Sequence, residues 1–235
     1  MSRRRSILLV LCALLHLQFR ADQEVLTIQK EELTGEFTPS RHPDFVRLRP
    51  PYTRRSDAWL RKTTANAFQQ MADAARKEGI SLVVVSATRN KAYQKRIWEN
   101  KWARRKGSDL EKARDILKYS SMPGTSRHHW GTDLDINDLN TSWWHSGTGE
   151  KCWLWLNEHA AGFGFFQPYS GSEQQRLSGY KEERWHWSYM PQSKPFLRAY
   201  NQLVDDTDLH GFSGADAAGE VRVIQDYVNG IKRDQ

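Results

Sequence analysis

Hydrophobic and polar positions recur with two different periods along this chain, and the change of period marks its predicted elements. From Leu60 to Ala75 the apolar residues recur near helical spacing, which predicts a helix that begins at Asp57 and ends near Lys77, before Gly79. The β-branched run from Ser81 to Ser86 predicts a short buried strand. The succession of helix, glycine and strand is typical of a layered α+β domain.

The rest of the chain continues this mixture of helices and strands. Further helices are predicted at residues 90–105, 108–119, 150–161, 195–204 and 220–229, and further strands at residues 132–136, 162–166 and 184–190. In the strand at 132–136, Asp133 and Asp135 share one face. In the strand at 184–190, His186 shares a face with Arg184 and Ser188, and the aromatic residues at 185, 187 and 189 share the other.

The two ends of the chain differ in composition from its middle. Three arginines precede the apolar run from Ile7 to Phe19, so residues 1–21 are predicted to be a signal peptide that directs export. A buried N-terminal helix and lipid attachment at Cys12 are the alternatives. Residues 22–56 are polar and contain four prolines, and are predicted to form a linker and an irregular arm. We therefore divide the rest into a catalytic domain, residues 57–206, and a helical tail, residues 207–235.

Composition narrows the class of protein. The chain has 235 residues, of which 38% are hydrophobic, including ten tryptophans, so it can build a sizeable core. Its net charge of +7 falls to +3 without the four arginines of residues 1–21, and such an excess argues little for nucleic acid. The same positive charge would suit binding to an anionic cell wall or membrane surface as well as it suits nucleic acid. Cys12 and Cys152 are the two cysteines, so a cleaved chain has no internal disulfide.

Two segments carry residues that suit a metal. The first, from Ser126 to Asp135, contains the imidazole of His128 and the carboxylate of Asp135. The second contains the carboxylate of Glu183 and the imidazole of His186. Two imidazoles and one carboxylate with an open fourth position are typical of catalytic zinc, and a nearby glutamate can act as the base. Taken singly, each residue is more often a packed histidine or a capping aspartate. The joint pattern favours a metal site.

The pattern Ser-x-His-x-x-Gly-x-x-x-Asp followed by Glu-x-x-His resembles the VanY-type zinc D-alanyl-D-alanine carboxypeptidases. Their superfamily also holds VanX-type dipeptidases, murein endopeptidases and the Hedgehog signalling domain. The resemblance runs from about Val83 to Pro191, and it includes four further short segments: residues 86–89, 123–126, 163–165 and 168–169. It implies a single α+β domain with a small, mostly antiparallel sheet flanked by helices.

The resemblance also implies roles for particular residues. Zinc would be bound by His128, Asp135 and His186, and Glu183 would be the catalytic base. Arg89 would bind the substrate carboxylate or stabilise the oxyanion, and Ser126 would help to bind substrate.

Asp133 stands where such relatives often carry alanine, so it either orients a ligand histidine or competes for the metal, and we favour the first interpretation. His129 lies outside the motif, and we interpret it as structural or as lining the substrate site.

The function that the resemblance implies is removal of the terminal D-alanine from peptidoglycan stem peptides by a zinc-activated water. It further implies an exported monomer of the periplasm or cell surface, attached to the membrane if the leader is retained, and without nucleic acid as a partner. Three alternatives stay open: an endopeptidase or dipeptidase of the same superfamily, a catalytically silent zinc module that binds the wall, and a histidine-rich metal nuclease.

Overall fold

The computed structural model describes residues 28–171, 176 and 178–231 of the chain. Its α-helices are α2 (Lys30–Thr34), α3 (Lys62–Lys77), α4 (Lys91–Trp102), α5 (Asp109–Ile116), α6 (Gly147–His159) and α7 (Met190–Leu203). Its strands are β1 (Phe45–Arg47), β2 (Trp59–Arg61), β3 (Val84–Ser86), β4 (Asp133–Ile136), β5 (Phe165–Phe166) and β6 (His186–Tyr189). The predicted signal peptide lies outside the described residues.

A small antiparallel sheet forms the centre of the molecule. Its strand order is β3-β4-β6-β5, and each neighbouring pair is antiparallel. In the register of β4 and β6, Asp135 lies opposite His186 and Asp133 lies opposite Ser188. The structure thus confirms the predicted α+β class with an antiparallel sheet and helices around it.

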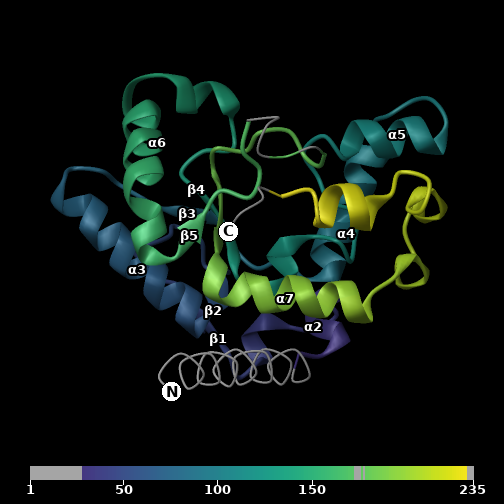
Figure 1. The fold of residues 1–235 in the computed structure, drawn as a ribbon, viewed down its shortest axis with the longest axis horizontal. Helices are drawn as coiled ribbons and strands as arrows, with labels where there is room; N and C mark the ends of the chain where they lie inside the picture. The colour runs from purple at the N-terminus through teal and green to yellow at the C-terminus, as the bar shows by residue number, and fades with distance from the viewer. Residues whose placement is uncertain (1–27, 172–175, 177, 232–235) are drawn as a thin grey trace, which may run out of the picture.

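One face of the sheet is apolar. Leu134 and Ile136 of β4 and Trp187 of β6 join a core cluster with residues of α3 and α6. In Figure 1 these two helices lie together on one side of the sheet. Because side chains alternate along a strand, the residues between them point to the opposite face. That face carries Asp133, Asp135, His186 and Ser188, as the alternation in the sequence predicts.

A second core lies on the polar side of the sheet. It contains Leu33 of α2, Trp98 of α4, Ile116 of α5 and Tyr200 of α7, all of which are buried. Figure 1 shows α4 and α5 on the side of the sheet away from α3 and α6. The polar face of the sheet therefore lies between two apolar cores, where charged side chains need specific partners.

The predicted helix start at Asp57 is wrong. Residues 59–61 form β2, which pairs with β1, and α3 begins only at Lys62. Asp57 instead forms an ion pair with Arg55 at 2.9 Å. The pairing partner lies in the segment predicted to be irregular, which in fact also forms α2 and β1 and buries Leu33 and Leu48. Local sequence favoured a helix, and a contact with a distant segment decided otherwise.

Several other predicted boundaries differ in the second half of the chain. The predicted strand at 162–166 is reduced to β5, because Ala160–Phe163 form a 3-10 helix. Helix α7 begins at Met190 rather than at 195, with Pro191 in its first turn, where a missing N–H costs nothing. The predicted helix at 220–229 is a π-helix over Val223–Val228. The residues from Leu209 to Val228 contribute several side chains to the second core, so this part of the predicted tail packs onto the domain. The division into domains itself stays a prediction.

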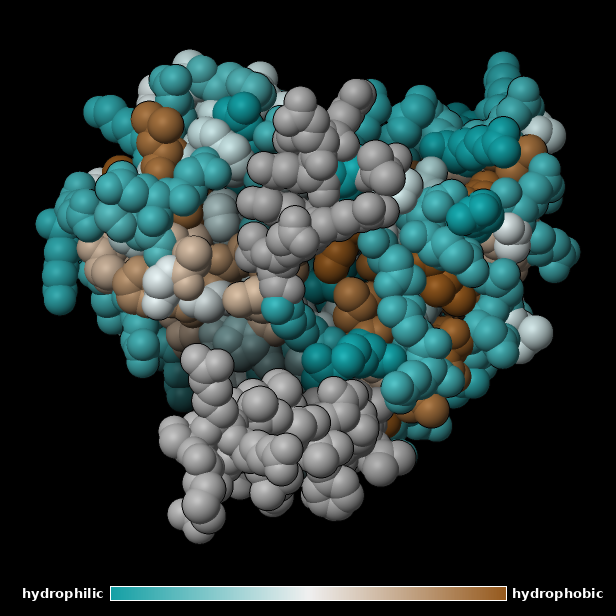
Figure 2. Space-filling view, in the orientation of Figure 1, coloured by the Kyte–Doolittle hydropathy of each residue, from teal (hydrophilic) through white to brown (hydrophobic). Residues whose placement is uncertain are grey.

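The surface of the molecule is mostly polar. Figure 2 shows hydrophilic residues over most of the visible face, with smaller areas of hydrophobic residues between them. The larger hydrophobic side chains that are exposed include Leu139 and Leu154. Within the described part of the chain, no helix has both the length and the apolar character that crossing a membrane requires.

Candidate metal centre

His128 is held by a short turn that leads into β4. The turn is a 3-10 helix over Arg127–Trp130, and it ends at Gly131, whose φ of +75° is a left-handed conformation that favours glycine. A Cβ at Gly131 would lie 2.4 Å from the Phe45 ring, which leaves no room for a side chain. The glycine of the motif is therefore required both by its conformation and by close packing against β1.

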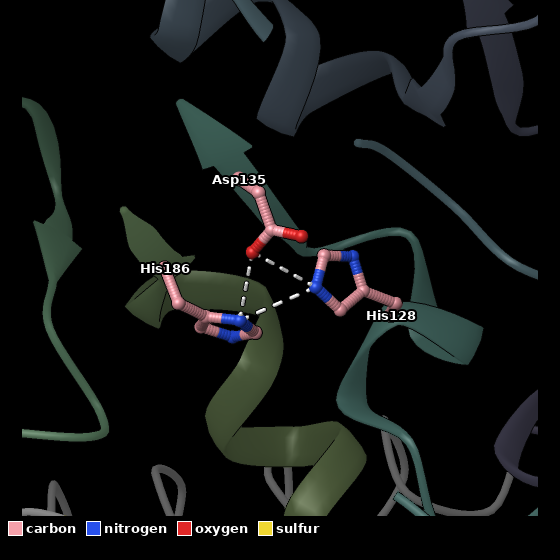
Figure 3. Close-up of side chains that lie close together, drawn as sticks. All are labelled: His128, Asp135 and His186. Carbon is pink, nitrogen blue, oxygen red and sulfur yellow. Dashed lines mark hydrogen bonds and ion pairs between the residues drawn. The ribbon is translucent and has the colours of Figure 1, made fainter. Parts of the chain in front are cut away.

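Three candidate ligands meet at one point (Figure 3). His128 comes from the turn, Asp135 from β4 and His186 from the paired strand β6. The Oδ1 atom of Asp135 lies 3.3 Å from His128 Nε2 and 3.1 Å from His186 Nδ1, and the two nitrogens are 3.2 Å apart. All three residues are buried. Among the described residues, these three form one of two groups whose ligand atoms lie close enough together to hold a metal ion, and the other group, Glu32, His42 and Asp44, is partly exposed.

The hydrogen bonds on the far sides of both rings fix one proton on each ring. Nδ1 of His128 lies 2.9 Å from the Ala87 carbonyl oxygen, which only accepts, so a proton is on Nδ1. Nε2 of His186 donates to Asp133 Oδ2 at 2.9 Å. Burial lowers the pKa of His128, so its Nε2 offers a lone pair. Burial would also lower the pKa of His186, but Asp133 and Asp135 raise it to about 9, so a bound cation would replace the Nδ1 proton that otherwise faces Asp135 Oδ1.

Such a convergence of two imidazole nitrogens and a carboxylate oxygen fits a cation. Ligands about 2.0–2.1 Å from a tetrahedral zinc lie about 3.3 Å from one another, close to the separations found here.

Asp133 is held in place by a buried polar network. Arg127 Nε donates to its Oδ2 at 2.9 Å, and the hydroxyls of Thr132 and Ser188 each donate to its Oδ1 at 2.7 Å. Burial alone would raise the pKa of Asp133, but the Arg127 guanidinium and His186 hold it well below its usual range. Both carboxylate oxygens are thus occupied. Asp133 orients His186, as we favoured from the sequence, and does not compete with Asp135 for the metal position.

Glu183 lies beside the three ligands. Its Oε2 atom is 3.6 Å from His186 Nδ1, and its side chain lines the cavity in front of the site. Burial raises the pKa of Glu183 to about 7, so this carboxyl exchanges a proton near neutral pH. The neighbouring Glu182 forms an ion pair with Arg184 instead, at 3.3 Å. Of the two adjacent glutamates, Glu183 is the one in the position of a base.

Arg89 lines the same cavity, which has a volume of about 590 Å³. Its Nη1 atom donates to Ser86 Oγ at 2.8 Å and lies 3.5 Å from Asp135 Oδ2. Its Nε has no hydrogen-bond partner among the described residues. The cavity therefore presents an arginine next to the candidate ligands and Glu183.

His129 does not line the cavity, and it holds the backbone of Arg89 in place. Its Nδ1 donates to the Arg89 carbonyl oxygen at 2.5 Å, and its Nε2 accepts from the Gly124 N–H at 3.1 Å. Burial lowers the pKa of His129 to about 3, so the ring is neutral. This favours the structural interpretation of His129. Ser126 is also buried and is not among the residues that line the cavity. Its role in substrate binding stays a prediction.

The sequence did not point to several residues of this region. Arg127 holds Asp133, and Gln94, Lys101 and Trp185 line the cavity. Gln94 and Lys101 lie seven residues apart on α4, which is about two helical turns, so they share one face of the helix. That spacing was the signal in the sequence that could have indicated them. It became meaningful only once the cavity was known, because exposed helices carry many such pairs.

The family model described as VanY, D-alanyl-D-alanine carboxypeptidase, matches residues 57–192, which is more than half of the chain. The chain belongs to the VanY family. The match contains the three candidate ligands, Glu183 and Arg89, so the geometry described above lies wholly within the part that defines the family.

Individual relatives agree with this assignment. A D-alanyl-D-alanine carboxypeptidase from Enterococcus faecalis is 32% identical over 126 residues, covering 52% of this chain and 45% of that protein. The putative carboxypeptidase YodJ of Bacillus subtilis is 30% identical over 157 residues, covering 64% and 51%. The chain thus spans about half the length of these curated relatives.

A structure of the vancomycin-resistance D,D-pentapeptidase VanY in complex with Zn(II) is 25% identical and superimposes with a TM-score of 0.51. It covers 70% of this chain and 88% of that one.

Proposed function

We propose that this protein is a zinc-dependent D-alanyl-D-alanine carboxypeptidase that removes the terminal D-alanine from peptidoglycan stem peptides. One observation carries the proposal. Ligand atoms of His128, Asp135 and His186 converge beside a buried glutamate, in a cavity that an arginine also lines. Membership of the VanY family and the carboxypeptidase relatives support the substrate class. The Zn(II) bound by the related VanY protein supports the choice of metal.

His128, Asp135 and His186 would hold the zinc ion. Zinc supplies Lewis acidity to such a site, since it polarises a carbonyl group and lowers the pKa of water. Glu183 would take a proton from the attacking water and return it to the leaving amine, which suits a carboxyl whose pKa is about 7. Asp133 accepts from Nε2 of His186, so Nδ1 would be the atom of that ring that binds zinc. The residues of the chain thus provide both the ligand set and the proton carrier.

Arg89 would bind the free carboxylate of the terminal D-alanine. A guanidinium stays charged and donates two parallel hydrogen bonds to a carboxylate, and Arg89 lines the cavity beside the candidate ligands. Its backbone follows β3, and His129 holds its carbonyl group. An endopeptidase would meet no such carboxylate at the cleaved bond, so a positioned arginine favours the carboxypeptidase.

We further propose that the protein is exported and acts on the cell wall. The basic residues and apolar run of residues 1–21 support this part of the proposal, and the family's substrate class agrees with it. Fusing Met1 to Glu24 to a reporter that functions only outside the cytoplasm tests it, and export of the reporter is expected. A silent reporter would contradict the export.

A comparison of two stem peptides that differ at one group tests which bond the protein cuts. One ends in D-Ala-D-Ala with a free carboxylate and the other in the C-terminal amide. The protein should release one D-alanine from the acid, as measured by mass spectrometry, and the amide should be a much poorer substrate. Arg89→Lys should weaken this preference, since lysine supplies only a point charge. Equal hydrolysis of both peptides by the unmodified protein would favour the endopeptidase instead.

A further inference from the structure

The cavity in front of the candidate metal centre has a second cationic side chain. Helix α4 presents Gln94, Ile97 and Lys101 to the cavity, at positions that share one helix face. Arg89 lies just before this helix, and Lys101 lies near its C-terminal end. The cavity therefore has one cation at each end of α4.

Lys101 has no acidic partner in the described part of the chain. Its Nζ donates to the hydroxyl of Ser120, and it forms no ion pair with a described residue. Burial lowers the pKa of Lys101, the positive charges of Arg105 and Arg89 lower it further, and the Glu183 carboxylate offsets part of this. An ammonium group that is half-buried without a carboxylate is unfavourable in the free protein. A bound anion would relieve that cost.

The carboxylates that line the cavity already have other roles. Asp135 belongs to the ligand set, and Glu183 is the proposed base. Arg105, the other basic residue that acts on Lys101, is paired with Asp115 at 2.9 Å. The remaining polar residues of the wall are neutral, and these include Ser120, Asn140 and Thr141. Of the two cations of this cavity, Lys101 is the one that forms no ion pair with a described residue, although the Glu183 carboxylate also acts on its charge.

We propose that Lys101 binds a second carboxylate of the substrate, on the residue that precedes D-Ala-D-Ala. The inference rests on the proposed function, in which Arg89 binds the terminal carboxylate. At about 1.5 Å per residue, Arg89 and Lys101 lie roughly 18 Å apart along the helix, and their side chains shorten this span. An extended peptide advances about 3.5 Å per residue, so Lys101 comes within reach of a long acidic side chain on the third residue from the end.

The chemistry of the cavity defines the preferred substrate class. A diamino-diacid such as diaminopimelate at that position carries a carboxylate beside its side-chain ammonium group, whereas lysine at the same position carries the ammonium group alone. With Arg89, Lys101 and a metal ion nearby, the cationic side chain is repelled and the carboxylate is attracted. Lys101 is therefore a specificity-determining residue for stem peptides with an acidic third residue.

A matched pair of peptides tests this assignment. Both contain diaminopimelate before D-Ala-D-Ala, and they differ only in whether its side-chain carboxyl group is free or converted to the primary amide. The zinc-loaded full chain should show about tenfold higher kcat/KM for the free acid, mainly through a lower KM, as one charge-assisted contact predicts. Lys101→Gln should abolish the preference, and Lys101→Arg should keep most of it.

Lys95→Gln is the control. Lys95 is exposed on the same helix and does not line this cavity, and its substitution removes the same charge. It should keep the preference for the free acid. If the unmodified protein does not discriminate between the two peptides, or if Lys101→Gln still does, the inference is wrong.

Binding separates this inference from the proposed function. Calorimetry with zinc-loaded Glu183→Gln measures the affinity for both peptides without turnover, and the free acid should bind about tenfold more tightly. Absence of hydrolysis by the unmodified protein, together with this difference in binding, would contradict the proposed function alone. Equal affinities would contradict the role of Lys101 alone.

Discussion

Asp133 is the residue through which the buried network acts on the candidate metal centre. Its Oδ2 atom accepts from both His186 Nε2 and Arg127 Nε. Asp133→Asn should weaken zinc binding by about 10–100-fold, because an uncharged amide, with one acceptor oxygen in place of two, holds the tautomer and orientation of His186 less well. Competition with a chromophoric chelator measures this affinity.

The same substitution should lower stability, since the buried Arg127 would lose its carboxylate. Removing one partner of a buried ion pair costs about 3–5 kcal/mol, which urea unfolding of the metal-free protein measures. Asp57→Asn is the control, because Asp57 is 62% exposed and far from the network. An unchanged zinc affinity in Asp133→Asn would show that His186 is oriented by other contacts.

Glu183 links the electrostatics of the site to its pH dependence. Because burial raises its pKa to about 7, Glu183 in the free protein becomes protonated as pH falls through neutrality and can no longer accept a proton. A metal ion nearby favours the charged form. The value of kcat/KM should therefore decline as pH falls, with a midpoint at or below 7.

Glu183→Gln should keep zinc and the fold but reduce kcat by about two to four orders of magnitude. Metal analysis and a full pH profile of both proteins check these expectations. Near-normal turnover by Glu183→Gln would mean that another group is the base.

At the scale of elements, the turn that carries His128 depends on one glycine. Gly131→Ala should be strongly destabilising, since the left-handed conformation costs about 1–2 kcal/mol and the new Cβ would meet the Phe45 ring. Gly79→Ala is a matched control, because Gly79 has a φ of +74° and no atom within 4 Å of the added Cβ. Urea unfolding should show a larger loss for Gly131→Ala. Equal losses would mean that the packing against β1 contributes nothing.

The strands show which features of the site could be predicted from the sequence. Alternation along 132–136 and 184–190 placed Asp133 with Asp135 and His186 with Ser188, and the register of β4 and β6 agrees. Strand alternation is a local property, so the sequence contains it. The pairing of β1 with β2 is not local, and the predicted helix start at Asp57 was wrong for that reason.

At the scale of the molecule, the candidate ligands come from segments about fifty residues apart that the sheet brings together. The motif spacing predicted that group of residues. The sequence did not predict the partners of the group, Arg127 and Lys101, because a buried arginine and an unpaired lysine look like ordinary surface residues in a polar stretch. Their roles follow from burial and from the shape of the cavity, which depend on the whole fold.

Residues 28–56, which precede the family match, also contact the elements that form the site. The Leu33 carbonyl accepts from Trp130 Nε1 at 3.1 Å, and the Gly35 carbonyl accepts from the Lys91 N–H at 2.8 Å. Glu32 forms an ion pair with the buried Arg61 at 2.5 Å. These contacts reach the turn of His128 and the start of α4, so residues 28–56 support both sides of the site although the family model does not include them.

A chain that begins at residue 57 should therefore be less stable and bind zinc less tightly. It loses the buried side chains of Leu33, Phe45 and Leu48, each of which stabilises by about 1.5–3 kcal/mol. At roughly 2–4 °C per kcal/mol, the melting temperature should fall by more than 10 °C. The control chain begins at Ile28 and keeps every contact described for this segment. Equal melting temperatures and zinc affinities for the two chains would show that residues 57–231 hold the metal centre without this support.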